Sequence, residues 1–325
     1  MSKVLVSGLK PSGELHIGNY LGVLKNLVDL QDGDYERFYF IADYHALTQK
    51  YDPKDKKEEI FKMAVDALAV GIDPKKSTLF LQSDIDEHNN LAWLLGNMVS
   101  TGELSRMIEY KEKVAQGQSP NAGLFNYPVL MAADILIYNA DLVPVGEDQR
   151  QHLELTRTIA RNFNARFGKT FKDPKAIHTK TPRIMSLNKP DQKMSKSIPT
   201  GCLFLSDSPA QIKKKVMSAA TDSHKNIGYD PKKRPGVSNL VDIYAAFAGV
   251  SPAKVVSMFK GVGYAEFKKD LAQLIVRELE PIQKERAKLL KNRSKVLKIL
   301  EEGAKKAKPI ATKSLERAKD KVGLI

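Results

Sequence analysis

The stretch KVLVSGLKPSGELHIGNY, residues 3–20, decides the fold. Residues 3–8 (KVLVSG) are apolar and β-branched, as in a short buried strand, and the glycines and proline that follow them indicate a turn. Leu21, Leu24 and Val28 then recur at helical spacing. A strand that leads through a tight turn into a helix is the first unit of an alternating α/β fold.

The same alternation continues through the first half of the chain. Pro128 is predicted to open a helix that runs to Tyr138, and Gly168 is predicted to end a long helix that includes Leu153. Alternation of this kind gives parallel strands joined by crossover helices, so we predict a doubly wound parallel sheet of the Rossmann-like type. The further strands are predicted at residues 37–42 (RFYFIA), 78–82 (TLFLQ) and 141–145 (DLVPV).

The second half of the chain has a different character. Residues 172–200 are rich in Pro, Lys, Asp and Ser and indicate loops. Beyond them apolar residues recur at helical spacing, with few strand signals, as far as the C-terminus. We therefore predict two domains, a sheet domain in residues 1–198 and a mostly α-helical domain in residues 199–325.

Basic residues exceed acidic ones, which gives the 325-residue chain a formal net charge of +14. The excess is concentrated beyond Lys193, with KKK at residues 213–215, KKR at 232–234 and repeated lysines from Lys284 onward. A basic surface attracts polyanions and favours nucleic acid as a partner. A lysine-rich helix can equally be a solvated face, so the charge alone leaves both interpretations open.

Composition excludes several other classes of protein. The single cysteine, Cys202, cannot form an internal disulfide or a Cys-rich zinc or iron–sulfur centre. Apolar runs reach about ten residues, whereas a membrane-spanning helix needs about 20. The N-terminal residues lack the apolar core of a secretory signal. We expect a cytoplasmic protein with no membrane partner, no protein-bound metal and no iron–sulfur cluster.

The turn after the first strand has the composition of a phosphate-binding turn. Gly13 and Gly18 allow close approach of the backbone, and the helix that begins near Gly18 offers unpaired N–H groups to an anion. His16 can donate a further hydrogen bond to a phosphate oxygen. The turn is not a Walker loop, because Glu14 follows Gly13 where Lys-Ser/Thr would be needed. On its own it can also be an ordinary strand–helix connection.

A second element is KMSKS, residues 193–197, within the predicted loop region. Two ammonium groups and two hydroxyls on one loop can meet a phosphate chain and stabilise charge that develops on a leaving pyrophosphate. The alternative is a solvated lysine loop.

Together the two elements are more specific. HIGN after the first strand, with KMSKS beyond the last strand, resembles the class I aminoacyl-tRNA synthetases, whose first motif reads HIGH where Asn19 departs from it. The resemblance implies an ATP-dependent enzyme in which His16, Lys193 and Lys196 are catalytic and ATP enters with magnesium. It implies that ATP also contacts Lys10, Pro11, Ser12, Gly18, Asn19, Gly146, Glu147, Asp148, Ile184, Met194, Ser195 and Ser197, beside Lys193 and Lys196.

One helical face carries a carboxylate in apolar surroundings. Tyr127, Met131, Asp134 and Tyr138 lie at intervals of four, three and four, so they share one face of the predicted helix. A buried carboxylate is costly unless something donates to it. A donor from a neighbouring element would satisfy Asp134, and so would a ligand. An indole N–H is a donor only, which suits a fixed carboxylate acceptor.

The segment YPVLMAADILIYNADLVPVGEDQRQHLELTR, residues 127–157, is similar to the tryptophan branch of the same family, and the similarity extends over essentially the whole chain. The tyrosine branch typically carries YPLLQAYD and VGGSDQ instead. Three departures from the tryptophan pattern are Lys10 in place of glutamine, Val6 in place of phenylalanine and Ile198 in place of aspartate. The similarity implies a tryptophan site made of Tyr127, Met131, Asp134, His45, Val143, Val145 and Gln149.

The resemblance implies a homodimer that activates L-tryptophan with ATP to the adenylate and transfers it to tRNA(Trp), with residues 199–325 binding the anticodon. The alternatives are a tyrosine-specific ligase, a nucleotidyltransferase with a HIGH-type turn and no RNA partner, and a non-catalytic paralogue. His88 has no partner at metal-ligand spacing and is assigned a structural role.

Overall fold

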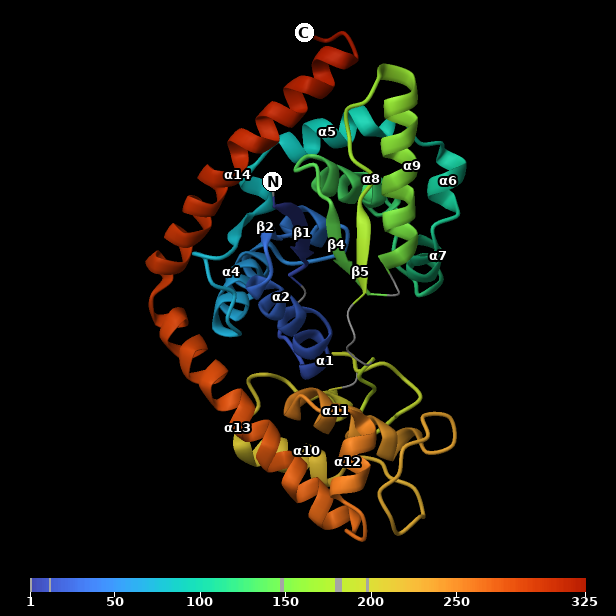
Figure 1. The fold of residues 1–325 in the computed structure, drawn as a ribbon, viewed down its shortest axis with the longest axis vertical. Helices are drawn as coiled ribbons and strands as arrows, with labels where there is room; N and C mark the ends of the chain where they lie inside the picture. The colour runs from blue at the N-terminus through green and yellow to red at the C-terminus, as the bar shows by residue number, and fades with distance from the viewer. Residues whose placement is uncertain (1, 12, 147–148, 179–182, 197–198) are drawn as a thin grey trace.

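A computed structural model describes the chain except for residues 1, 12, 147–148, 179–182 and 197–198 (Figure 1). At its centre is a sheet of five parallel strands in the order β3-β2-β1-β4-β5. This order confirms the predicted doubly wound, Rossmann-like class. The strands are β1 (Lys3–Leu9), β2 (Tyr35–Ile41), β3 (Thr78–Leu81), β4 (Leu142–Val145) and β5 (Lys175–His178).

Helices connect the strands and then continue alone to the C-terminus (Figure 1). Those within the sheet region are α1 (Ile17–Asn19), the π-helical turn η1 (Tyr20–Leu24), α2 (Lys25–Asp29), η2 (Leu30–Asp32), α3 (Asp43–Ala46), α4 (Pro53–Ala69), η3 (Gln82–Asp84), α5 (Glu87–Gly96), α6 (Thr101–Ser105), α7 (Ile108–Ala115), α8 (Ala122–Leu136) and α9 (Arg150–Phe167). The later ones are η5 (Pro199–Gly201), α10 (Pro209–Met217), α11 (Pro235–Ala248), α12 (Pro252–Met258), α13 (Tyr264–Lys291) and α14 (Arg293–Lys321).

Both faces of the sheet are buried. Successive side chains of a strand point to opposite faces, and each set packs into a hydrophobic core of its own. Leu5 and Tyr39 belong to one core, which also includes α4 and helices α10 to α13. Val6 and Phe38 belong to the other core, under α5, α8 and α9. The first core runs without interruption from the sheet into the C-terminal helices, so the two parts of the chain pack as one body there.

The structure corrects two sequence predictions. Strand β5 lies within residues 172–200, which were predicted to be loops; its four residues KAIH are too short and too polar to stand out. Pro128 does not open α8 but lies inside it, and the helix begins after Asn121, whose Oδ1 accepts a hydrogen bond from the Leu124 N–H at 2.8 Å. Pro128 removes one hydrogen bond of the helix, and the packing of the buried apolar residues of α8 against α5 and α9 stabilises the helix despite this loss.

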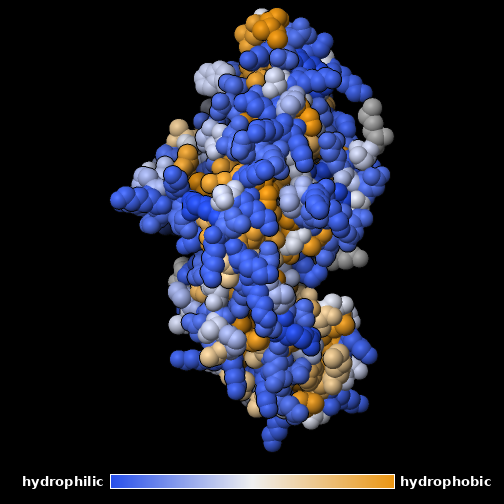
Figure 2. Space-filling model, turned by 90° about the vertical axis from the view of Figure 1, so that its left-hand side faces the viewer, coloured by the Kyte–Doolittle hydropathy of each residue, from blue (hydrophilic) through white to orange (hydrophobic). Residues whose placement is uncertain are grey.

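The last helix departs from a simple division of the chain at residue 198. Helix α14 leaves α13 and returns along the sheet, where it lies against the edge strand β3 and against α5 (Figure 1). Gly303 makes this contact possible, since a Cβ there would fall 1.9 Å from the carbonyl oxygen of Leu79. Part of residues 199–325 therefore packs on the sheet domain. The face formed by α13 and α14 is largely hydrophilic (Figure 2).

Among the described residues no single helix is long and apolar enough to span a membrane. Helices α11 and α12 reach that length and composition only as a pair, and they are bent by 101° with respect to each other.

Candidate active site

The candidate site lies where the strand order reverses, between β1 and β4. The two strands are paired only at Leu5 and Leu142, and β4 then pairs with β5 alone. The carboxyl ends of β1 and β4 therefore separate, which is where doubly wound sheets bind ligands. The predicted pocket walls Val143 and Val145 are buried on β4 at this point, and Val6 is buried opposite on β1.

The HIGN turn begins α1 with a reciprocal cap. His16 Nδ1 accepts a hydrogen bond from the Asn19 N–H at 3.3 Å, and Asn19 Oδ1 accepts one from the His16 N–H at 3.2 Å. Because Nδ1 is the acceptor, the neutral ring carries its proton on Nε2, which leaves that N–H for a ligand. Burial, with Lys196 and Lys193 nearby, lowers the pKa of His16 to about 4. His16 is therefore neutral at pH 7.

The lysine loop starts as one side of a small hairpin. Lys193 and Met185 form an antiparallel bridge, and the Met194 N–H donates to the carbonyl oxygen of Ile184 at 3.1 Å. Asn239 on α11 holds the other edge: its Oδ1 accepts from the Met185 N–H and its Nδ2 donates to the Met185 carbonyl oxygen. The predicted ATP residues Ile184, Lys193 and Met194 are thus fixed to the helical part of the chain.

The structure brings the HIGN turn and the lysine loop together. A Cβ on Gly13, which adopts φ +80°, would lie 4.0 Å from Lys196 Nζ, and one on Gly18 would lie 3.6 Å from the Ile184 Cβ. Beyond the loop the chain pairs directly with the turn. The Ile17 N–H donates to the Leu203 carbonyl oxygen at 2.9 Å, and Leu205 N–H donates to the Leu15 carbonyl oxygen at 2.9 Å.

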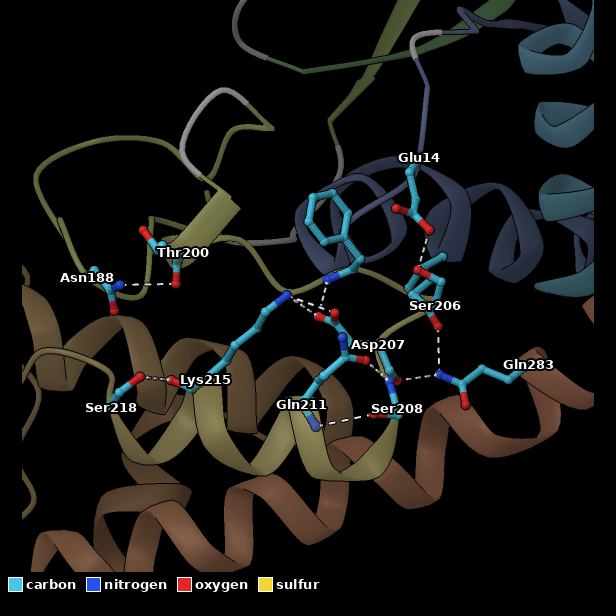
Figure 3. A network of polar contacts seen from close by, with 12 residues as sticks. Glu14, Asn188, Thr200, Ser206, Asp207, Ser208, Gln211, Lys215, Ser218 and Gln283 are labelled. Carbon is cyan, nitrogen blue, oxygen red and sulfur yellow. Dashed lines mark hydrogen bonds and ion pairs between the residues drawn. The ribbon is translucent and has the colours of Figure 1, made fainter. Parts of the chain in front are cut away.

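A polar network fixes the segment that follows the loop (Figure 3). Ser206 Oγ donates to Glu14 of the turn. Buried Asp207 accepts from Lys215 Nζ at 2.6 and 2.7 Å and from the Phe204 N–H at 2.8 Å. Gln283 Nε2 on α13 donates to the carbonyl oxygens of Leu205 and Asp207. The position of the HIGN turn is therefore coupled to α10 and α13.

Lys10, one of the three departures from the family pattern, directly follows β1 at the edge of the candidate site. Its Nζ donates to Thr48 Oγ1 at 3.4 Å. Burial, with the charges of Lys113 and Lys56, lowers the pKa of Lys10 to about 8. The lysine adds a cation where a family member would have a neutral amide, next to the buried Pro11.

Asp134 is completely buried, and its carboxylate is already satisfied by the protein. Its Oδ2 accepts from His45 Nε2 at 2.7 Å. Its Oδ1 accepts from Gln82 Nε2 at 2.7 Å and from His88 Nδ1 at 2.6 Å. Burial alone would raise the pKa of Asp134, but His45 and His88 outweigh it and lower the pKa to about 2. Of the two explanations for a buried carboxylate, neighbouring donors account for its burial, and a ligand is not needed for that.

Some of the remaining predicted tryptophan residues lie on the same helix as this carboxylate, and others lie elsewhere. Tyr127 and Met131 lie on α8 with Asp134, and Tyr127 Oη is 2.6 Å from His152 Nε2. Gln149 stands just before α9, and its N–H donates to the carbonyl oxygen of Gly146. Of the predicted ATP residues, Asn19 and Ser195 lie in the described turn and loop, and Ser12, Glu147, Asp148 and Ser197 lie outside the described residues.

Sequence reasoning missed Gln82 and His88. They stand 52 and 46 residues from Asp134 in the chain, so no local spacing links them to it. In the described part of the chain no group of three or more His, Cys, Asp or Glu side chains is placed to hold a metal ion.

The low pKa of His16 makes acid stability a test of its environment. Between about pH 6.5 and 4 the unfolded histidine binds a proton that the folded one does not, so acidification through this window should cost up to about 3 kcal/mol of unfolding free energy. His16→Gln keeps a donor near Nε2 but cannot titrate. Urea unfolding of both proteins at neutral and mildly acidic pH should show a smaller acid-induced loss in the variant. Equal losses in the two proteins would contradict this assignment.

Comparison with known proteins places the chain in a family. Residues 2–280 match the model of the tRNA synthetases class I (W and Y). The chain is 48% identical to the tryptophan–tRNA ligase of Caldanaerobacter subterraneus, over 99% of each chain. Its structure superimposes with a TM-score of 0.92 on tryptophanyl-tRNA synthetase from Mycoplasma pneumoniae, at 36% identity, covering 100% of this chain and 99% of the other. The synthetase from Campylobacter jejuni, solved with ADP and tryptophan, gives 0.84 at 37% identity and covers 99% and 100%.

The glycine turn and lysine loop that meet at the switch point agree with these matches, and the chain belongs to the class I tRNA synthetases of the W and Y family. The family model includes tyrosine enzymes as well, so it does not choose between the two amino acids. The full-length relatives do: the chain falls in the tryptophan–tRNA ligase branch, and the tyrosine alternative, the RNA-independent nucleotidyltransferase and the non-catalytic paralogue are not supported.

Proposed function

We propose that the protein activates L-tryptophan with ATP to tryptophanyl-adenylate and then transfers the tryptophanyl group to tRNA(Trp) for protein biosynthesis in the cytoplasm. The observation that carries the first step is the contact between the HIGN turn and the lysine loop across the crevice. His16 and Lys196 are far apart in sequence, but their side chains are close enough in the structure for the lysine charge to act on the histidine ring.

The residues present can activate a carboxylate without a general base. The tryptophan carboxylate is already ionised at neutral pH and attacks the α-phosphorus of ATP as pyrophosphate leaves. His16 donates from Nε2 to a phosphate oxygen, and Lys193 and Lys196 stabilise the charge that develops on the leaving group. Magnesium enters with ATP as part of the substrate. Asp134 accepts the indole N–H.

Pyrophosphate exchange with each amino acid in turn tests this proposal. Tryptophan should support exchange of labelled pyrophosphate into ATP, and phenylalanine, which lacks the ring N–H, should not do so at comparable concentration. Exchange that depends equally on tyrosine, or no exchange with tryptophan, would overturn it.

The second step needs a surface for tRNA. We assign it to the helical part, residues 199–325, as an anticodon-binding region. Lysines on α13 and α14 support this assignment, because Lys288, Lys291, Lys298, Lys305 and Lys308 are exposed. The face formed by these two helices is largely hydrophilic (Figure 2).

Salt should separate tRNA binding from amino-acid binding. Neutralised phosphates release counterions, so the KM for tRNA in aminoacylation should rise steeply as KCl is increased, by about tenfold or more between 50 and 200 mM for a protein with several phosphate contacts. The KM for tryptophan should change little. A tRNA KM that is insensitive to salt would remove the electrostatic argument for this surface.

We propose a homodimer that uses the surface around Trp93. This side chain, the single tryptophan of the chain, is 79% exposed on α5, and Leu47 nearby is 45% exposed. Both line a cavity of about 510 Å³ whose inner wall includes His45 and Tyr127. Large exposed apolar side chains around a hollow are typical of an interface with another protein. A second copy would cover the indole and close the outer end of the cavity.

Trp93→Glu is expected to dissociate the dimer, since the change places a charge in the centre of an apolar contact. Sedimentation velocity should show the variant as a monomer at concentrations where the parent is a dimer. Leu297→Glu is the matched control, because Leu297 is 46% exposed on α14 and lines a different cavity from the one beside Trp93. Equal association of all three proteins would remove this interface from the proposal.

A further inference from the structure

The surroundings of Asp134 assign separate tasks to its two oxygens. A carboxylate oxygen offers about two lone-pair directions to donors. Oδ1 accepts from both Gln82 Nε2 and His88 Nδ1, so its capacity is used. Oδ2 accepts from His45 alone among the described residues, so it has room for another donor.

Burial separates the two oxygens in the same way. Gln82 and His88 are both 0% exposed, so the Oδ1 side of the carboxylate faces the protein interior. The His45 side chain, which donates to Oδ2, is 11% exposed and lines the cavity of about 510 Å³, so the Oδ2 side of the carboxylate is the less deeply buried one.

Further contacts on the interior side fix the two donors. His88 Nδ1 must donate, because an ionised carboxylate only accepts, and His88 Nε2 lies 2.8 Å from the Tyr138 hydroxyl oxygen, within hydrogen-bond distance. Tyr138 in turn stacks on Phe38, with ring centroids 4.6 Å apart. The Gln82 amide must present Nε2 to Asp134, because its oxygen in that position would be repelled by the carboxylate oxygen. Gln82 Oε1 has no hydrogen-bond partner in the described part of the chain, so the amide is placed for Asp134 and not for a second contact.

We propose that His88, assisted by Gln82, is the positioning residue that makes this enzyme specific for an amino acid with a ring N–H. His88 does not touch the substrate. It holds Oδ1, which fixes the plane of the carboxylate and leaves Oδ2, with its remaining lone pair, as the acceptor for the indole N–H. This inference rests on the proposed function, and it goes beyond the structural role expected for His88 from the sequence.

Two substitutions of His88 separate the bond to Asp134 from the bond to Tyr138. An asparagine amide occupies nearly the position of histidine Nδ1, so His88→Asn can still donate to Asp134 but loses Tyr138. A glutamine amide reaches the position of Nε2, so His88→Gln keeps the contact with Tyr138 and loses the one with Asp134. Both variants remove the ring, so a general packing loss should affect them alike.

The measurement is pyrophosphate exchange with tryptophan and with β-(3-benzothienyl)alanine, in which sulfur replaces the ring N–H. The parent enzyme should prefer tryptophan strongly. His88→Gln should raise the KM for tryptophan about tenfold or more, the loss expected when a charged hydrogen bond is no longer aligned, and should change the KM for the analogue and for ATP little. His88→Asn should keep the preference for tryptophan within about threefold of the parent.

Each result decides the inference. A preference for tryptophan that is retained in His88→Gln, or that is lost equally in both variants, would overturn the role of His88. Because the readout is a ratio of two substrates on the same protein, partial unfolding of a variant cancels. Asp134→Asn separates this failure from failure of the proposed function: if that variant also keeps the parent preference, Asp134 is not the indole acceptor, whatever His88 does.

Discussion

Asp134→Ala is expected to weaken tryptophan binding strongly and to destabilise the fold at the same time. The substitution removes the indole acceptor, and it also leaves the buried donors of Gln82, His88 and His45 without their partner. An unpaired buried donor costs about 1–3 kcal/mol, so the unfolding free energy should fall by about 3 kcal/mol or more, and tryptophan binding should lose at least about 1–3 kcal/mol. Urea unfolding and tryptophan binding by calorimetry measure the two effects separately.

The dependence of the unfolding free energy on pH, at low pH, provides a check on the same residue. The pKa of Asp134 is lowered to about 2 in the folded protein, below its unfolded value. Its contribution is therefore present above about pH 4 and is lost as the pH falls towards about 2, a window below that of His16. Asp134→Asn should be less sensitive than the parent over this lower window. If Asp134→Ala unfolds normally and binds tryptophan normally, both the network and the indole assignment are wrong.

Lys196→Ala is expected to slow adenylate formation by about 10²–10³-fold, the usual effect of removing one preorganised donor that stabilises developing charge. The lysine is half-buried beside Gly13, and burial, only partly offset by Glu59, lowers its pKa. Its ammonium group meets phosphate and not the indole, so the dissociation constant for tryptophan should remain within about threefold. Single-turnover adenylate formation in a rapid-quench experiment measures the rate, and equilibrium titration measures binding.

Lys213→Ala is a suitable comparison for that experiment, because Lys213 is an exposed lysine on α10, the helix behind the loop, and is not one of the residues named in the network that holds the HIGN turn. If its effect on the rate equalled that of Lys196→Ala, the loop charge would not be acting on the leaving group. A large loss of tryptophan affinity in Lys196→Ala would contradict the assigned role as well.

Much of the fold could be predicted because local pattern and global arrangement agree. The first strand, its turn and the following helix are found where residues 3–20 place them, and four of the five strands carry apolar or aromatic runs. Strand β5 was missed because KAIH has two apolar residues between two polar ones and its burial depends on β4 beside it. The start of α8 was missed because Pro128 is a strong local signal that tertiary packing overrides.

The sequence could predict which residues belong to the candidate site, but not the hydrogen bonds that hold them in place. HIGN and KMSKS were identified separately, while the hydrogen bonds that hold the HIGN turn come from Leu203 and Leu205, which lie beyond KMSKS and carry no motif. The donors to Asp134 come from α3, η3 and α5, and nothing in their spacing links them. Backbone pairing between distant segments depends on the folded chain, and so does the formation of buried polar clusters. Neither leaves a periodic pattern in a single sequence.

The contact between Gly303 and strand β3 has a consequence for how the protein is made. An edge strand presents unpaired N–H and C=O groups that can recruit a strand from another chain and so promote aggregation. Residues 78–81 leave the ribosome early, but their cover, residues 293–321, is synthesised only much later. A growing chain therefore carries an open sheet edge until α14 emerges. The helix then packs closely against β3, because Gly303 has no side chain at the contact, and it shields that edge from neighbouring nascent chains.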